Sequence, residues 1–339
     1  MAPERVWDWR FVLANMTSKS YFAPMRSLKK PRCDEVANSQ VTDKLRFPEG
    51  PVWLSDGRML AVEIRGKALT EILPDGTCRP LALLEGGPNG AAAGPDGWIY
   101  VCNSGGWVYT QEANGWVRPT GQSGLNGWIE RVRLSDGKVE RLYDGCDGTP
   151  FFAPNDLVFD ASGGFYFTDH GLRSPDTFRL GAVYYALPDG SRIHRVITTL
   201  VTPNGIGLSP DGTTLYVAET VPRRLWAFDL ASPGELAGRQ PWPSPSGGRL
   251  IAGLPGAAYL DSLAVDSAGH IAVASFDDCG IWDISPDGTD CTFLPFDDFY
   301  ATNICFGGPD MQDALVTLSS TGRLVRMRWP RPGLKPHFC

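Results

Sequence analysis

The chain has 339 residues, an apolar content of 42% and a formal net charge of −7. An acidic balance opposes nonspecific binding to nucleic acids and to anionic membranes. No apolar run approaches the roughly 20 residues that span a bilayer, and the first ten residues hold no signal-peptide core. We therefore expect a cytoplasmic protein with no nucleic-acid partner and no membrane partner.

The cysteines and histidines show no spacing typical of a zinc site. Eight cysteines occur without a C-x-x-C pair, and four histidines occur without an H-x-x-x-H pattern. We expect mostly free thiols, and a Cys279–Cys291 bridge is the one pairing left open. Gly86–Gly90 lacks the Lys-Ser/Thr of a phosphate loop, and no G-x-S-x-G turn is present, which argues against a serine hydrolase.

Residues 1–45 precede a set of repeats and mix aromatic and charged residues without helical spacing. We expect this extension to pack on the repeats and to add an outer strand to the last of them, because an unpaired edge strand is a liability. In the alternative interpretation, Trp7, Trp9, Tyr21 or Phe22 reaches over the functional site as a lid.

One phrase recurs six times between residues 46 and 330. It runs from a turn through one oxygen-bearing residue, an apolar strand and a Gly turn to a second apolar strand, as in Phe47–Glu63. The copies lie roughly 40 to 65 residues apart, which is the range of propeller blades. The pattern predicts an all-β fold, a six-bladed β-propeller. The oxygen-bearing residues are Glu49, Asn89, Asn155, Asn204, Asp261 and Asn303.

Three segments depart from the regular repeat. Thr110–Trp128, in the second copy, is rich in Gly, Asn and Trp and is predicted to be a surface loop that selects substrate or forms a dimer contact. Pro241–Gly248 is predicted to be a second long loop. The tail, residues 331–339, is Pro-rich and expected to be irregular. The assembly is expected to be a monomer or a homodimer.

The six oxygen-bearing residues occupy equivalent positions, so a propeller directs them at one axis. Polar groups there need a partner, because burying one unpaired costs several kcal/mol. Any single Asn or Asp can instead cap a turn. Capping a turn, however, would not explain why two of the six residues, Glu49 and Asp261, are acids. Two carboxylates with amide oxygens suit one divalent cation held by oxygen atoms only.

The phrases Phe47–Trp53, Pro154–Leu157, Pro203–Ile206, Leu260–Asp266 and Thr302–Asp310 resemble those of the SMP-30/gluconolactonase/luciferin-regenerating family of six-bladed propellers. Paraoxonase and the staphylococcal drug-responsive lactonase are more distant relatives. The resemblance covers about residues 45 to 328.

The resemblance implies a lactone-opening hydrolase with a divalent cation at the top of the channel. Ca²⁺ is the first candidate, and Zn²⁺, Mn²⁺ and Mg²⁺ are alternatives. Position by position, the implied ligands are Glu49, Asn204 and Asp261, with Asn155 as a further ligand or substrate contact. Sugar-lactone members carry an Arg where this chain has Ala153. The difference argues against a polyhydroxylated sugar lactone, and the Trp-rich insertion with Phe151–Phe152 favours a more apolar lactone or an ester as the small-molecule substrate.

The implied mechanism assigns a role to each remaining candidate. Asp261 is the expected general base as well as a ligand, because its matching position has that role in the family. His170 is expected to carry a proton to the leaving alkoxide, or alternatively to close a turn with Asp169. The predicted substrate contacts are Asn89, Asn303, Phe151 and Ser262. Glu219 is expected to be structural, paired with Arg223 or Arg224.

Three other functions remain open from the sequence. A non-enzymatic scaffold would bind no metal tightly, and a calcium buffer would bind metal without turning over lactones. A strictosidine-synthase-like condensing enzyme shares the propeller fold but resembles this chain less.

Overall fold

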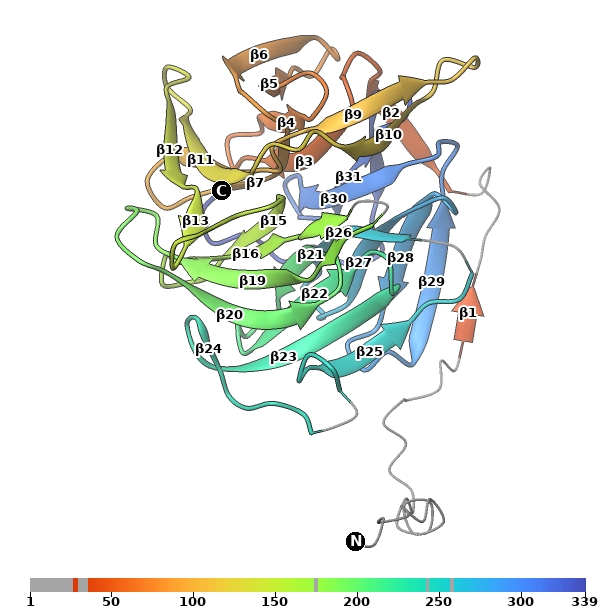
Figure 1. Ribbon diagram of the computed structural model, residues 1–339. Helices are drawn as coiled ribbons and strands as arrows, with labels where there is room; N and C mark the ends of the chain where they lie inside the picture. The colour runs from red at the N-terminus through yellow and green to blue at the C-terminus, as the bar shows by residue number, and fades with distance from the viewer. Residues whose placement is uncertain (1–26, 30–35, 174–175, 242–243, 257–258) are drawn as a thin grey trace, which may run out of the picture.

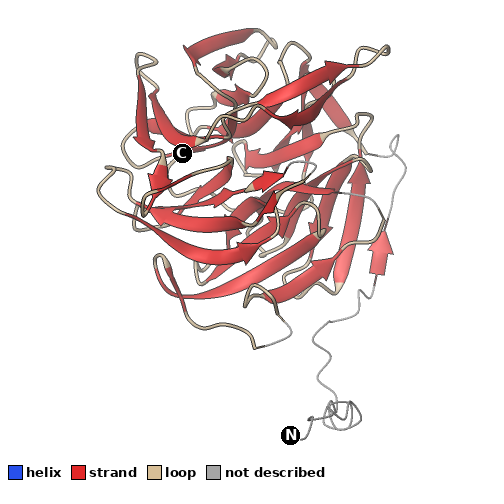
Figure 2. Cartoon of the chain, in the orientation of Figure 1, coloured by secondary structure: helices blue, strands red, loops and turns tan. Residues whose placement is uncertain are grey.

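The computed structural model describes residues 27–29 and 36–339, apart from 174–175, 242–243 and 257–258. Every regular element in this part of the chain is a β-strand (Figure 2). None of the described residues forms a helix long and apolar enough to cross a membrane. Six small sheets lie around a ring (Figure 1), which confirms the predicted all-β, six-bladed propeller.

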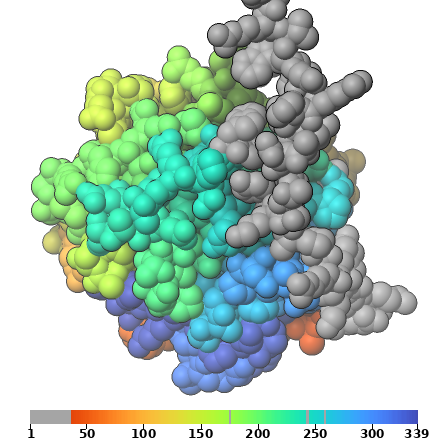
Figure 3. All heavy atoms as spheres, turned by 90° about the horizontal axis from the view of Figure 1, so that it is seen from below, coloured from red at the N-terminus to blue at the C-terminus, as the bar shows by residue number. Residues whose placement is uncertain are grey.

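The first strand of each blade faces the centre of the ring. These inner strands contact one another in cyclic order, and the last contacts the first, so the ring is closed. Seen from below, blades four, five and six lie side by side (Figure 3). The inner strands are β3 (Pro48–Trp53), β7 (Pro88–Ala93), β15 (Pro154–Phe159), β21 (Pro203–Leu208), β26 (Tyr259–Val265) and β30 (Ala301–Gly307).

Three further antiparallel strands complete each blade. The second strands are β4 (Met59–Glu63), β8 (Trp98–Asn103), β16 (Phe165–Asp169), β22 (Thr214–Glu219), β27 (Ile271–Phe276) and β31 (Asp313–Leu318). The third strands are β5 (Ala68–Ile72), β11 (Trp128–Arg133), β19 (Gly181–Ala186), β23 (Arg224–Ser232), β28 (Gly280–Ile284) and β32 (Arg323–Arg328). The outer strands are β6 (Cys78–Leu83), β12 (Val139–Tyr143), β20 (Ile193–Leu200), β25 (Arg249–Gly253), β29 (Asp290–Pro295) and β2 (Asn38–Thr42).

Blade six is built from both ends of the chain. Its outer strand, β2, pairs antiparallel with β32, so the N-terminal segment covers the edge that the C-terminal strands would leave open. A second N-terminal strand, β1 (Ser27–Lys29), pairs parallel with β29 of blade five. Trp7, Trp9, Tyr21 and Phe22, the candidates for a lid, lie outside the described residues.

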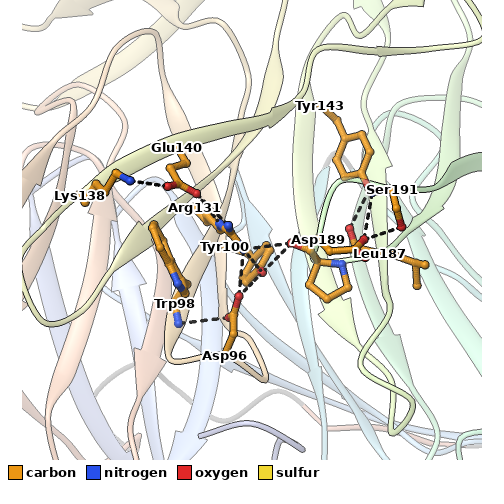
Figure 4. A network of polar contacts seen from close by, with 11 residues as sticks. Asp96, Trp98, Tyr100, Arg131, Lys138, Glu140, Tyr143, Leu187, Asp189 and Ser191 are labelled. Atoms are coloured by element: carbon orange, nitrogen blue, oxygen red, sulfur yellow. Dashed lines mark hydrogen bonds and ion pairs between the residues drawn. The ribbon is translucent and has the colours of Figure 1, made fainter.

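Apolar faces of adjacent blades pack into the core between them. Between blades two and three, a ring cluster includes Tyr100, Phe159 and Phe165, whose centroids lie 5.0 to 5.5 Å apart. At its rim, the Arg131 guanidinium donates to Asp96 at 3.0 Å and to Glu140 at 2.8 Å (Figure 4). This interface therefore joins blades two and three through apolar packing, with the Arg131 ion pairs at its rim.

The predicted loop at Thr110–Trp128 is largely a β-hairpin. It is formed by β9 (Trp107–Gln111) and β10 (Val117–Gln122), inserted between the second and third strands of blade two. The turn at Asn114–Gly115 explains the hairpin, since Gly115 has a φ of 88° and Asn114 Oδ1 accepts the Trp116 N–H at 3.0 Å. We call this hairpin, Trp107–Gln122, the strap.

Two other expectations can be compared with the structure. Cys279 and Cys291 are both buried and form no disulfide bridge with each other, and Cys33 lies outside the described residues. The tail forms no strand but is ordered against the ring. Its Leu334–Cys339 segment and all six inner strands enclose a cavity of about 190 Å³ at the lower end of the channel.

Candidate active site

Each inner strand carries one extra residue at the level of its oxygen-bearing side chain. In blade three, Pro154 pairs with Asp169 and Leu157 pairs with Phe167, so three steps on β15 face two on β16. The other five inner strands show the same irregularity. A bulge turns two successive side chains toward the same side of a sheet. The bulges therefore give the channel two layers of inward positions, and three of the lower positions are glycines, namely Gly50, Gly90 and Gly205.

The upper layer lines a pocket of about 920 Å³ at the mouth of the channel. Its members come one from each blade and all carry an oxygen. They are Glu49, Asn89, Asn155, Asn204, Asp261 and Thr302. The structure therefore brings all four predicted cation ligands, together with Asn89, to one pocket.

The lower layer lies beneath it and differs from what the phrase alignment predicted. In blade six, Ala301 takes the place of Pro154, so Thr302 is the equivalent of Asn155 and Asn303 is the equivalent of Asp156. Asn303 does not line the pocket. Its Nδ2 donates to Glu49 Oε2 at 2.7 Å and its Oδ1 accepts the Ile304 N–H. Asn303 thus orients Glu49 rather than a substrate.

Ser262 and Phe151 also lie away from the pocket, contrary to their predicted role. Ser262 belongs to the lower layer, with its hydroxyl 3.5 Å from Asn204 Oδ1. The Phe151 ring is fully buried in the core between blades, against Phe167 at 5.3 Å and Tyr184 at 5.1 Å. The Phe151 ring therefore fills the core between strands and does not contact the pocket.

Glycines let the inner strands approach one another at this level. A Cβ on Gly50 would lie 2.7 Å from the Asn89 carbonyl oxygen of the next blade. A Cβ on Gly205 would lie 2.7 Å from the Asp261 carbonyl oxygen. These two glycines directly follow Glu49 and Asn204, so the close approach occurs where the oxygen-bearing side chains must converge.

Three carboxylates are buried together around the channel. Burial raises the pKa of Asp156 to about 7 and that of Asp261 to about 8, and the charge of Asp156 contributes to the second shift. Burial and the nearby Asp261 raise the pKa of Glu49 well above its usual range. Asp156 was not among the predicted site residues. In a regular strand, Asp156 would point away from the channel, because successive side chains alternate between the two faces. The bulge turns Asp156 inward next to Asn155.

The pocket floor also holds amide oxygens without partners. Asn89 Oδ1 and Asn155 Oδ1 are buried and accept no hydrogen bond from the described residues. An orphaned buried oxygen is costly, and so is a group of buried like charges. One divalent cation would satisfy both, since carboxylate and amide oxygens are the ligands that Ca²⁺ and similar hard ions prefer. The residues present therefore fit a hard cation.

His170 lies on the wall of the same pocket, just after β16. Burial, with a smaller contribution from the charge of Arg173, lowers the pKa of His170 to about 4. The imidazole is therefore neutral near pH 7. Asp169 does not hold the His170 ring; it accepts the N–H groups of Phe152, Ala153 and Gly171.

The ends of the second strands brace the inner strands from behind. Glu63 accepts the Arg46 N–H at 2.7 Å, and Asp169 accepts the Ala153 N–H at 2.8 Å. Glu219 accepts the N–H of Val201 and the Trp226 indole N–H, the latter at 2.7 Å. Glu219 is thus structural, as expected, but its partners are Trp226 and a backbone amide instead of Arg223 or Arg224.

A second acidic cluster lies on blade five, distant in the fold from the pocket floor. Asp266, His270 and Asp283 place their ligand atoms within 4.8 Å of one another. Arg331 of the tail already pairs with Asp266 and lies 2.6 Å from Asp283 Oδ1. This one guanidinium already pairs with both carboxylates, so we interpret the cluster as the anchor of the tail and not as a metal site.

The fold and the pocket together define a propeller with an oxygen-lined central site. The chain belongs to the SMP-30/Gluconolactonase/LRE-like family, whose model matches residues 47–320. The predicted membership of the family is therefore confirmed.

The chain is also similar to individual proteins of known name. A gluconolactonase of Zymomonas mobilis is 28% identical over 333 residues, which cover 88% of this chain and 84% of that protein. The lactonase drp35 of Staphylococcus saprophyticus is 38% identical over 122 residues, but these cover only 36% of this chain and 35% of that protein. The crystal structure of regucalcin from Agrobacterium tumefaciens, described as a calcium-binding protein, has a TM-score of 0.66 at 17% identity, covering 92% of this chain and 99% of that one.

Proposed function

We propose that this protein is a divalent-metal-dependent hydrolase that opens a lactone or a related ester. The observation that carries the proposal is the upper layer. Side chains from five blades bring two carboxylates and three amides to one pocket, and the Asn89 and Asn155 oxygens there lack a partner. Two of the known proteins it resembles are named as a gluconolactonase and a lactonase, which supports lactone hydrolysis.

Glu49, Asn155, Asn204 and Asp261 would hold the cation, with Ca²⁺ as the first candidate. When bound, such an ion polarises a carbonyl and lowers the pKa of water. Asn303 keeps the Glu49 carboxylate in place through its 2.7 Å hydrogen bond. The Thr220 hydroxyl accepts the Asn204 Nδ2–H at 3.2 Å, which leaves the Asn204 oxygen directed away from Thr220. The ligand side chains are thus oriented before any substrate arrives.

Asp261 would act as the general base. Its carboxylate would stay ionised beside the proposed cation and next to the attacking water, although burial alone raises the pKa of Asp261. It would remove the proton from the attacking water while Asn89 orients the lactone carbonyl. His170, neutral and on the pocket wall, would donate its N–H proton to the ring oxygen as the C–O bond breaks. It would regain a proton from Asp261, so that the proton taken from water ends on the product alcohol and both side chains are reset.

The test combines metal analysis with lactone and aryl-ester hydrolysis. We expect purified protein to bind one divalent cation, to lose hydrolysis on chelation and to regain it on adding Ca²⁺. Asp261→Asn should lower kcat/KM by about 10² to 10⁴. Asp229→Asn, an exposed carboxylate on β23, is the control and should behave as wild type. Absence of both tight metal binding and turnover would instead favour a binding scaffold. Metal binding without turnover would favour a calcium buffer.

A further inference from the structure

Five aromatic rings form a continuous arc along one side of the pocket. In order, Tyr109 lies 5.0 Å from Phe47, Phe47 lies 5.7 Å from Tyr300, Tyr300 lies 5.0 Å from Phe276, and Phe276 lies 5.2 Å from Tyr259, all between ring centroids. All five side chains line the pocket. We call them the aromatic arc. Such spacings are those of favourable aromatic pairs.

The arc lies next to the groups proposed to do the chemistry. Phe47 comes two residues before Glu49, and Tyr259 comes two residues before Asp261 on β26. The rings of Tyr109, Tyr259 and Phe276 are only partly buried, so the pocket side of the arc presents apolar surface. A substrate carbonyl at the upper layer would therefore have apolar surface beside its substituents.

The strap fixes one end of the arc over the pocket. On one side, the Val117 N–H donates to the Ser320 carbonyl at 3.1 Å and the Ser320 hydroxyl donates to the Val117 carbonyl at 2.8 Å, which ties the strap to blade six. On the other side, Gln122 donates to the Gly171 carbonyl at 3.2 Å and accepts the Arg173 N–H at 3.3 Å. Held at both edges, the strap presents Tyr109 to the pocket without depending on a ligand.

Several polar side chains of the pocket are already engaged within the protein. The Thr302 hydroxyl lies 2.6 Å from that of Ser319, and the Thr120 hydroxyl donates to the Val108 carbonyl at 3.2 Å. Gln122 holds the strap, and Thr220 holds Asn204. A lactone with several hydroxyl groups would find these four side chains occupied, and the buried Tyr109 hydroxyl is a pocket group above the floor that has no partner among the described residues. Buried hydroxyls that lose water without a partner weaken binding.

We infer that the substrate carries an apolar ring or chain next to its lactone or ester group, and that the aromatic arc binds this part. The inference rests on the proposed hydrolase function and adds the substrate class. The apolar substituent packs against Tyr259, Phe276 and Tyr300, while the carbonyl lies at the upper layer. Selectivity comes from apolar contact with the arc and from the internal hydrogen bonds that already occupy Thr120, Gln122, Thr220 and Thr302.

The experiment compares three lactones with the same six-membered ring, on the full-length protein in millimolar Ca²⁺. They are unsubstituted δ-valerolactone, a phenyl-substituted δ-valerolactone and D-glucono-1,5-lactone. We expect kcat/KM for the phenyl lactone to exceed that for the sugar lactone by at least about tenfold. Phe276→Ala should reduce the ratio of phenyl to unsubstituted kcat/KM by about tenfold, because one side of the arc is lost.

Val108→Ala is the matched control, since Val108 lies on the same strap strand as Tyr109 but is 54% exposed and outside the pocket. Its selectivity ratio should equal that of wild type. If Phe276→Ala does not fold, Tyr259→Ala tests the same contact at the neighbouring ring of the arc. Faster turnover of the sugar lactone, or an unchanged ratio in a folded arc variant, overturns the inference alone. No turnover of any of the three lactones overturns the hydrolase proposal with it.

Discussion

Replacing Asp156 with Asn should stabilise the metal-stripped protein, and the gain should grow as the pH rises. Burial raises the pKa of Asp156 to about 7, whereas an exposed Asp titrates near 3.9. The folded protein therefore holds this proton more tightly than the unfolded chain does. Folding takes up a proton between about pH 4 and pH 7, so raising the pH through this window opposes folding.

The two pKa values set the magnitude. For a single group shifted from 3.8 to about 7, the cost to folding is about 2 kcal/mol at pH 5 and about 4 kcal/mol at pH 8. Asp156→Asn should therefore gain about 2 to 3 kcal/mol relative to wild type between these two pH values. The total stability of a typical domain is only about 5–15 kcal/mol, so the effect is measurable. His170 has the opposite sign, since its pKa is lowered, but it titrates in both proteins and cancels in the difference.

The assay is urea unfolding of wild type and Asp156→Asn at pH 5, 6.5 and 8, with chelator and then with excess Ca²⁺. Bound cation favours the ionised carboxylates, so Ca²⁺ should shrink or reverse the gain of the variant. Asp229→Asn, with an exposed side chain, should show no pH-dependent difference. A stability difference between Asp156→Asn and wild type that stays constant or decreases from pH 5 to pH 8 would refute the reasoning.

Three further substitutions test other parts of the site. Asn303→Ala removes the hydrogen bond to Glu49 and should weaken cation affinity by about 10- to 100-fold in titration calorimetry; unchanged affinity would contradict an orienting role. Gly205→Ala should cost about 1–3 kcal/mol of unfolding free energy because its Cβ meets the Asp261 carbonyl, whereas Gly253→Ala, with nothing within 4 Å, is the control. Arg331→Ala should cost about 3 kcal/mol by leaving buried Asp266 unpaired, and calorimetry should detect no cation bound there in the wild-type protein.

The repeated phrase was sufficient to predict the blades and the convergence of their oxygen atoms. Local spacing specifies each strand pair, and ring closure follows from six equal units. It could not place Asn303 or Asp156, because one extra residue in the inner strand decides which side chain faces the pocket. The alignment of the repeated phrases placed blade six one residue out of register, because it matched Asn303 instead of Thr302 with Asn155.

The aromatic arc was beyond sequence reasoning for a different reason. Its rings come from residues 47, 109, 259, 276 and 300, and no local pattern relates positions so far apart. Phe151 shows the converse error. An aromatic residue next to the site phrase suggested a substrate contact, but neighbouring apolar strands bury it completely. Only the packing of adjacent blades distinguishes a pocket ring from a core ring.

The hydrogen bond between Asn303 and Glu49 joins residues that are 254 positions apart, across the seam where blade six meets blade one. On the ribosome, Glu49 emerges long before its partner, and the outer strand of that final blade must wait for β32. If Glu49 and the other proposed ligands hold a cation, its binding should coincide with completion of the fold. A nascent or C-terminally truncated polypeptide would contain most of the proposed ligand oxygens but could not yet arrange them.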